Sequence, residues 1–160
     1  MYRIGQSTDI HQLVAGRKLI LGGVEIDHPL GLLGHSDADV LVHVIAEALL
    51  GALALGDLGH HFPDTDPRFK DANSLDLLAE VMQMIQMRGY SIVNVDSLVL
   101  IEQPKLAPYI KQMKDVLCPV LSIELNKINI KATRGEKMGF VGRQEGVVAQ
   151  AIVLLKKVES

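Results

Sequence analysis

The stretch Ser36-Asp-Ala-Asp-Val-Leu-Val-His-Val-Ile-Ala-Glu-Ala-Leu-Leu-Gly-Ala-Leu-Ala-Leu55 decides how the rest of the chain is arranged. Ser36 with Asp39 three residues later resembles a capping box, which predicts a helix from Ser36 to about Leu55. The predicted helix is apolar on almost every side, so we expect it to be buried, in part against another chain. Asp39, His43 and Glu47 recur every four residues and share one stripe. Asp39 could therefore orient His43, or His43 could be an ordinary helix histidine.

Strand-like and helix-like segments alternate on both sides of this helix. Alternating or continuous apolar patterns predict strands over 2–11, over 18–26 around Gly22-Gly23, over 91–101 and over 127–132. Caps and helix breakers predict a helix from Asn73 or Ser74 to Arg88, ended by Gly89, and another from Pro108 to Pro119. The pattern over 144–158 fits either a strand or a helix. The interleaving predicts mixed α/β layers in a single domain over 1–160, and no glycine fingerprint indicates a dinucleotide site.

Composition restricts the class of partner. Apolar residues make up 48% of the 160 residues and charged residues 22%, as in an ordinary globular domain. Aromatic residues are only 4%, the net charge is −3, and no long basic run is present, so a nucleic-acid partner is not expected. The lone Cys118, the absence of a signal-peptide pattern and the polar interruptions of the apolar run over 40–56 predict a cytoplasmic protein with no membrane partner.

Asp9, His11 and His43 have side chains suited to a catalytic metal. If the first segment is a strand, its period of two places Asp9 and His11 on one face, and His43 would come from the predicted helix. Two nitrogens and one oxygen leave the fourth position of a tetrahedral zinc ion open for water or substrate. The spacing alone also fits a strand-end aspartate and two unrelated histidines.

Two loops carry further polar groups. The segment over 56–67 holds three aspartates and two histidines, which fits either a second metal cluster or a solvated turn. The segment over 133–143 is rich in glycine, which fits either a phosphate-binding loop or ordinary turns.

Eight motifs occur in order along the chain: Asp9-Ile-His11, Gly34-His-Ser-Asp-Ala-Asp-Val-Leu-Val-His43, Ala48-Leu-Leu-Gly51, Gly56-Asp-Leu-Gly59, Phe62-Pro-Asp-Thr-Asp66, Pro104-Lys105, Lys131-Ala-Thr133 and Gly139-Phe-Val-Gly-Arg-Gln-Glu-Gly146. With these motifs the chain resembles the 2-C-methyl-D-erythritol 2,4-cyclodiphosphate synthase family of the non-mevalonate isoprenoid pathway, from Ile4 to about Leu155. The resemblance implies an α+β fold in which helices cover one face of a mixed β-sheet. It also implies a cyclic homotrimer whose active sites lie between subunits.

The resemblance implies an intramolecular phosphoryl transfer. The substrate is 4-diphosphocytidyl-2-C-methyl-D-erythritol 2-phosphate, whose 2-phosphate attacks the β-phosphate, so that a cyclic diphosphate forms and CMP leaves. Zinc, or another divalent metal, would be bound by Asp9, His11 and His43. Mg²⁺ or Mn²⁺ would bridge the substrate phosphates with the support of Glu136. His35, Arg134 and Glu136 are the implied catalytic residues.

The implied substrate-binding residues come from all the motifs. They are Asp9, His11, His35, Ser36, Asp57, Gly59, Phe62, Asp64, Asp66, Lys105, Thr133, Phe140 and Arg143. Phe140 and Arg143 stand where a ligand cavity on the trimer axis could close.

The chain departs from the family pattern at a few positions. Arg134-Gly135 stands where many members carry two further threonines, and Arg134 cannot reproduce a short hydroxyl contact, although its guanidinium could reach a phosphate. Gln6-Ser7-Thr8, Glu47 and Glu102-Gln103 also differ from the usual residues.

Two other functions stay open on the residues. A metal-dependent phosphohydrolase with the same Asp and His set would use water as the nucleophile and would release a linear product. A non-catalytic trimer that senses a cytidine nucleotide or an isoprenoid diphosphate would keep the fold, but it would not need all three metal ligands together with Glu136.

Overall fold

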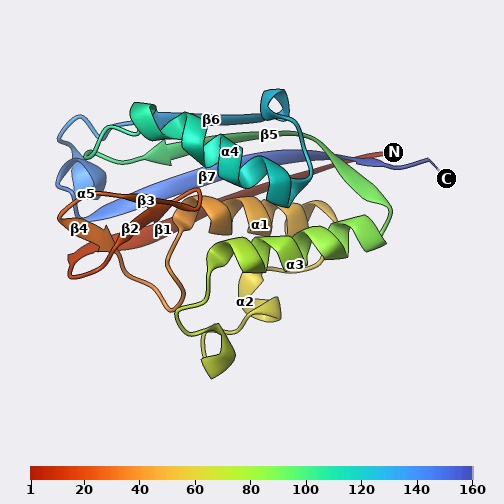
Figure 1. Ribbon diagram of the computed structural model, residues 1–160, viewed down its shortest axis with the longest axis horizontal. Coiled ribbons are helices and arrows are strands. Elements are labelled where there is room, and N and C mark those ends of the chain that lie inside the picture. Colours follow the sequence, from red (N-terminus) through yellow and green to blue (C-terminus); the bar gives the residue numbers. More distant parts are fainter. Residues whose placement is uncertain (160) are drawn as a thin grey trace.

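The computed structural model describes residues 1–159 and has a five-stranded mixed sheet in the order β4-β1-β7-β5-β6 (Figure 1). Only β5 and β6 pair in parallel, and the other pairs are antiparallel. The strands are β1 (Tyr2–Ala15), β2 (Leu19–Leu21), β3 (Val24–Ile26), β4 (Leu30–Leu32), β5 (Tyr90–Leu100), β6 (Ile128–Thr133) and β7 (Gly146–Lys157). The chain termini meet at one end of the long strands, where the Lys157 N–H donates to the Met1 carbonyl.

Helices cover one face of this sheet, and the predicted α+β class with a mixed sheet is confirmed. The main helices are α1 (Val40–Ala52), α3 (Ser74–Met87) and α4 (Ile110–Leu121). Helix α1 packs on β1 and β7, α3 packs on α1 and β5, and α4 packs on α3 and β6. Shorter helical turns are α2 (Leu58–His61), η1 (Pro67–Phe69), η2 (Ala107–Tyr109), η3 (Leu125–Lys127) and α5 (Gly139–Gly142). Within residues 1–159, no helix has the length and apolar character that crossing a bilayer requires.

Asp39 begins α1 and fixes it to a β-hairpin. Its carboxylate accepts the Val42 N–H as an N-cap and also accepts the N–H groups of Gly22 and Gly23. These two glycines have φ of +58° and +72° and form the tight turn between β2 and β3. The helix therefore starts later than the predicted Ser36. The expectation that Asp39 orients His43 is wrong, because its oxygens are occupied by backbone donors.

Helix α1 is buried by its own chain. Ten of its thirteen residues are buried, although the structure contains one chain only. At Gly5 of β1 a Cβ atom would lie 1.9 Å from the Ala48 carbonyl oxygen, so the strand and the helix backbones touch directly. The apolar character of α1 is thus explained by packing within the chain and needs no neighbouring chain.

Other differences from the predicted elements are local. Pro119 lies inside the last turn of α4, and the helix ends at Leu121 with Ser122 in the left-handed conformation. The short strand β4 was not predicted, and the predicted loop over 56–67 contains α2. The ambiguous segment over 144–158 forms the central strand β7.

The face of the sheet away from the helices exposes large apolar side chains. Residues of β1 alternate, so that Gly5 and Ser7 face the helices while Ile4 and Ile10 are 70% and 56% exposed. Ile152 on β7 is 47% exposed. These three exposed apolar residues lie on the adjoining strands β1 and β7.

Candidate metal centre and substrate cavity

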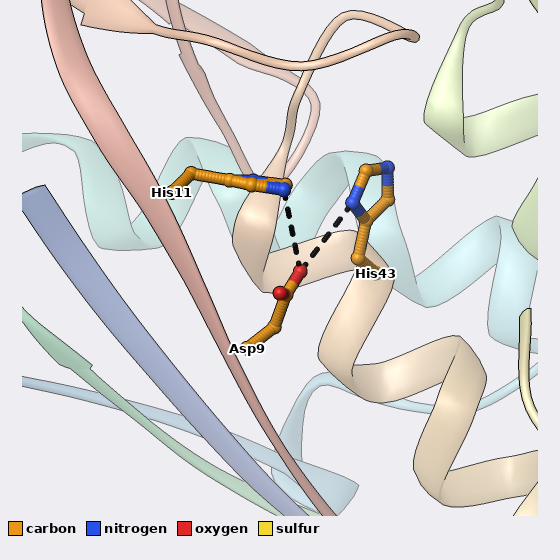
Figure 2. A group of neighbouring side chains, drawn as sticks. All are labelled: Asp9, His11 and His43. Carbon is orange, nitrogen blue, oxygen red and sulfur yellow. Dashed lines mark ion pairs between the residues drawn. The ribbon is translucent and has the colours of Figure 1, made fainter. Parts of the chain in front are cut away.

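Strand β1 and helix α1 bring Asp9, His11 and His43 together (Figure 2). The Oδ2 atom of Asp9 lies 3.5 Å from Nε2 of His11 and 3.6 Å from Nδ1 of His43. The two imidazole rings are nearly perpendicular, at 89°. The three side chains therefore come from one strand face, as the strand period predicts, and from the first turn of the helix that packs on it.

The separations suit a small divalent ion. Oxygen and nitrogen ligands at zinc distances and tetrahedral angles lie about 3.3–3.4 Å apart, close to the 3.5 and 3.6 Å measured here. The side chains of Asp9, His11 and His43 are 29%, 14% and 16% exposed, so the group is half-buried but can be reached. The three residues form a group that could hold a divalent metal ion.

The protonation states of Asp9 and His11 favour metal binding. Burial alone would raise the pKa of Asp9, but the polar contact with His43 and the charges of both imidazoles outweigh it, and this pKa lies below its usual value. Burial is the largest cause that lowers the pKa of His11, and it outweighs the opposing attraction of the Asp9 carboxylate. At neutral pH the pair is a carboxylate and a neutral imidazole, the forms that coordinate metals.

The metal group lies on the wall of a cavity of about 420 Å³. This volume suits a small organic ligand. Of the predicted site residues, the lining includes Asp9, His11, His35, Ser36, His43, Gly59, Phe62 and Asp64. The lining also includes Glu47, whose carboxylate accepts the Ser7 hydroxyl at 2.7 Å.

Two further predicted residues of this region serve the loop that surrounds the cavity. Asp57 is the N-cap of α2 and accepts the His60 N–H. Asp66 caps η1, and its side chain pairs with Arg68 at 2.7 Å. The Asp66 carbonyl oxygen lies 3.3 Å from Nε2 of His35. Neither aspartate side chain lines the cavity, and the described residues form no second metal cluster here.

The residues predicted to bind the nucleotide lie at a second cavity of about 190 Å³. Lys105, Thr133 and Arg134 line it, with apolar residues from the end of β6 and from the segment that follows β5. The buried carboxylate of Glu102 accepts the Gly135 N–H at 2.9 Å, so this acid supports the loop backbone. The two cavities have no lining residue in common.

The remaining predicted residues lie in the glycine-rich segment. Glu136 is exposed and has a left-handed φ of +52°. Phe140 is on α5 and is 39% exposed, and Arg143 pairs with Glu145 at 2.8 Å. None of these three side chains lines either cavity of the single chain.

Two residues around His43 were not found from the sequence. Nε2 of His43 lies 2.8 Å from Oγ of Ser74, and Ser74 donates through its hydroxyl to Asp37. Asp37 is within a quoted motif and Ser74 was considered only as a helix start. No sequence signal places α3 against the first turn of α1, so their contact with His43 could not be anticipated.

The α+β fold places an Asp-His-His group that could hold a divalent metal on the wall of a cavity, an arrangement typical of metal-dependent enzyme sites. The chain matches the YgbB family over residues 2–156. It is 56% identical over 160 residues to the 2-C-methyl-D-erythritol 2,4-cyclodiphosphate synthase of Geobacillus thermodenitrificans, with 100% of both chains covered. The corresponding enzyme of Chlorobaculum tepidum is 56% identical over 154 residues, 96% of this chain and 98% of that one.

Solved structures of other proteins have the same fold as this chain. The bifunctional IspDF of Campylobacter jejuni superimposes with a TM-score of 0.95 at 39% identity, over 99% of this chain and 43% of that one. The Plasmodium falciparum IspF in complex with CDP has a TM-score of 0.88 at 33% identity, over 99% and 97% of the two chains. The chain belongs to the YgbB family of 2-C-methyl-D-erythritol 2,4-cyclodiphosphate synthases, which are lyases of isoprenoid precursor synthesis.

Proposed function

We propose that the enzyme converts 4-diphosphocytidyl-2-C-methyl-D-erythritol 2-phosphate into 2-C-methyl-D-erythritol 2,4-cyclodiphosphate and CMP, at sites shared between the subunits of a cyclic homotrimer. The observation that carries this proposal is the Asp9, His11 and His43 group, which faces a cavity large enough for the substrate's sugar and phosphates. The relative that was solved with CDP supports a cytidine diphosphate substrate.

The reaction needs charge stabilisation more than proton removal. The attacking 2-phosphate oxygen is already anionic, so no strong general base is required. The difficulty is that two negatively charged phosphates must be brought together. Zinc on the Asp9, His11 and His43 group would polarise the β-phosphate, and Mg²⁺ or Mn²⁺ near Glu136 would neutralise charge between the phosphates. His35 and Ser36 line the cavity beside the metal group, where they can donate to phosphate oxygens.

The other residues divide between the two ends of the substrate. Asp57, Gly59, Phe62, Asp64 and Asp66 belong to the loop around the first cavity, where the methylerythritol hydroxyls would bind. Lys105 and Thr133 would bind the cytidine diphosphate in the second cavity, and the Arg134 guanidinium would contact a phosphate there. Phe140 and Arg143 would close a cavity on the trimer axis.

The separation of the two cavities supports a shared site. Asp9, Ala149, Val99 and Ala132 form one row across β1, β7, β5 and β6, and Thr133 follows Ala132. Three strand spacings separate the ends of this row, about 14 Å. Ala149 and Val99 between them are fully buried under the helices, so packed side chains separate Asp9 from Thr133 on that face of one chain. A neighbouring subunit could bring its nucleotide cavity to the metal side.

The exposed sheet face supports the trimer. Ile4, Ile10 and Ile152 present apolar surface on the side opposite the helices, and packing three such faces around an axis would bury it. The apolar character of α1 does not support the trimer, because its own chain already covers this helix.

A product assay tests the proposed reaction. The purified protein is incubated with the cytidine-diphospho substrate and Mg²⁺, and the products are identified by mass spectrometry and ³¹P NMR. We expect CMP and a cyclic diphosphate in equal amounts. Inorganic phosphate or a linear diphosphate would instead identify a phosphohydrolase that uses water as the nucleophile.

The variant Glu136→Gln should weaken the response to Mg²⁺ and leave zinc content unchanged. The exposed side chain loses its charge and keeps its shape, so the fold should not change. We expect the Mg²⁺ concentration for half-maximal activity to rise about tenfold. Glu80→Gln removes an exposed charge from α3 and is the matched control. Loss of zinc from Glu136→Gln, or an unchanged Mg²⁺ titration, would contradict separate roles for the two metals.

A further inference from the structure

We propose that Ser74 and Asp37 form a hydrogen-bond relay that holds His43 with Nδ1 free for the metal. This inference rests on the proposed metal centre and adds two positioning residues to it. Neither residue touches the Asp9 side of the imidazole, so both would act through His43.

The relay runs away from the metal group through the opposite edge of the ring. Nδ1 of His43 faces Oδ2 of Asp9, while Nε2 points away from it (Figure 2). Nε2 lies 2.8 Å from Oγ of Ser74, a residue with 0% exposure at the first turn of α3. The Ser74 hydroxyl donates to Oδ1 of Asp37, and the Ser74 N–H donates to Oδ2 at 3.0 Å.

The position of Asp37 is itself fixed. Its N–H donates to the Ala72 carbonyl at 3.1 Å, and its Oδ1 also accepts the Asp39 N–H at 3.1 Å. The carboxylate is therefore held between the starts of α1 and α3. A fixed acceptor of this kind orients the Ser74 hydroxyl without further rearrangement.

Counting protons determines the tautomer of His43. A serine hydroxyl has one proton, and the Ser74 proton is used on Asp37, since an ionised carboxylate can only accept. Ser74 Oγ can therefore only accept from His43, so a neutral His43 must carry its proton on Nε2. The lone pair is then on Nδ1, the atom that faces Asp9. Metal-binding histidines typically donate their other ring N–H in this way.

The same proton count affects Ser36. Its Oγ lies 3.1 Å from Nε2 of His43 and accepts the Ala38 N–H at 3.2 Å. Because His43 is the donor in this contact, the Ser36 hydroxyl proton is not used there. Ser36 lines the metal cavity, so that proton is left to donate to a substrate phosphate.

His11 provides a contrast within the same group. Its Nδ1 is buried and has no hydrogen-bond partner among residues 1–159. The relay thus fixes one of the two imidazoles, and we expect His43 to be the better-ordered ligand in the metal-free protein.

The first test reads the tautomer directly. Metal-free protein labelled with ¹⁵N-histidine is studied by NMR under mildly alkaline conditions, and the His43 signals are assigned from their loss in His43→Ala. We expect a proton on Nε2 and a lone pair on Nδ1 in the wild type. A proton on Nδ1 of the wild-type His43 would overturn the proposal, whether or not any variant folds.

The second test uses Ser74→Ala and Asp37→Asn. Each should give a mixture of His43 tautomers and a loss of zinc affinity of about 10- to 100-fold in a chelator competition. Ser97→Ala is the matched control, because Ser97 is also a buried serine whose hydroxyl donates, but to the Asn129 carbonyl away from the cavity. Unchanged tautomer and zinc affinity in both variants would refute the relay alone. A wild type that binds no zinc would instead contradict the proposed function.

Discussion

The His43→Ala variant is expected to purify with almost no zinc and to lose measurable cyclodiphosphate formation, while the wild type holds about one ion per chain. Two ligands, Asp9 and His11, would remain, and both belong to β1. Losing a hydrogen-bond partner of a ligand already costs roughly 10- to 100-fold in metal affinity, so losing a ligand should cost more. Elemental analysis after dialysis against a weak chelator measures the content.

The control is His60→Ala, which removes an exposed histidine of α2 outside the cavity lining. It should keep its zinc and its activity. Circular dichroism of each metal-free variant separates loss of a ligand from loss of the fold. Full zinc content and activity in a folded His43→Ala protein would eliminate this residue as a ligand.

Coexpression of His43→Ala and Lys105→Ala chains is expected to restore activity that neither variant has alone. Each shared site would combine the metal side of one subunit with the nucleotide side of the next. With equal random mixing, about one quarter of the sites would pair two intact sides. Every mixed trimer has one such site in three, so mixed trimers isolated through two different affinity tags should rise from background to about a third of the wild-type activity.

A second mixture shows whether complementation depends on opposite sides of the site. His11→Ala and His43→Ala both damage the metal side, so their mixed trimers should stay at background. If the mixed His43→Ala and Lys105→Ala trimers form and remain inactive, the site lies within one chain. A protein that sediments as a monomer would remove the trimer proposal altogether.

Elements with a strong local pattern could be predicted from the sequence. The spacing of apolar residues and the stop at Gly89 gave the α3 helix nearly to its ends. The period-two placement of Asp9 and His11 held because strand geometry alone determines it. The start of α1 was predicted at Ser36, but Asp39 is the N-cap of the helix and its carboxylate also accepts the N–H groups of Gly22 and Gly23. That contact joins residues 16 and 17 positions apart, beyond any local rule.

Features that depend on tertiary contacts were out of reach. The segment over 146–157 gave no clear period because the outward positions of β7 include the apolar Val148 and Ile152, so that polar and apolar residues do not alternate. Ser74 meets His43 only because α3 packs across α1. The resemblance assigned the metal and nucleotide residues to a site between subunits, and the single chain holds them in two separate cavities.

Strand β1 has a further consequence for how this protein can change. Its inner face carries Asp9 and His11, and its outer face carries the exposed Ile4 and Ile10. Inserting or deleting one residue between positions 4 and 9 would exchange the faces on one side of the change, relative to β7. Catalysis and assembly would then be damaged by a single event. Over many generations this strand should therefore accept replacement of individual side chains but keep its length between Ile4 and His11.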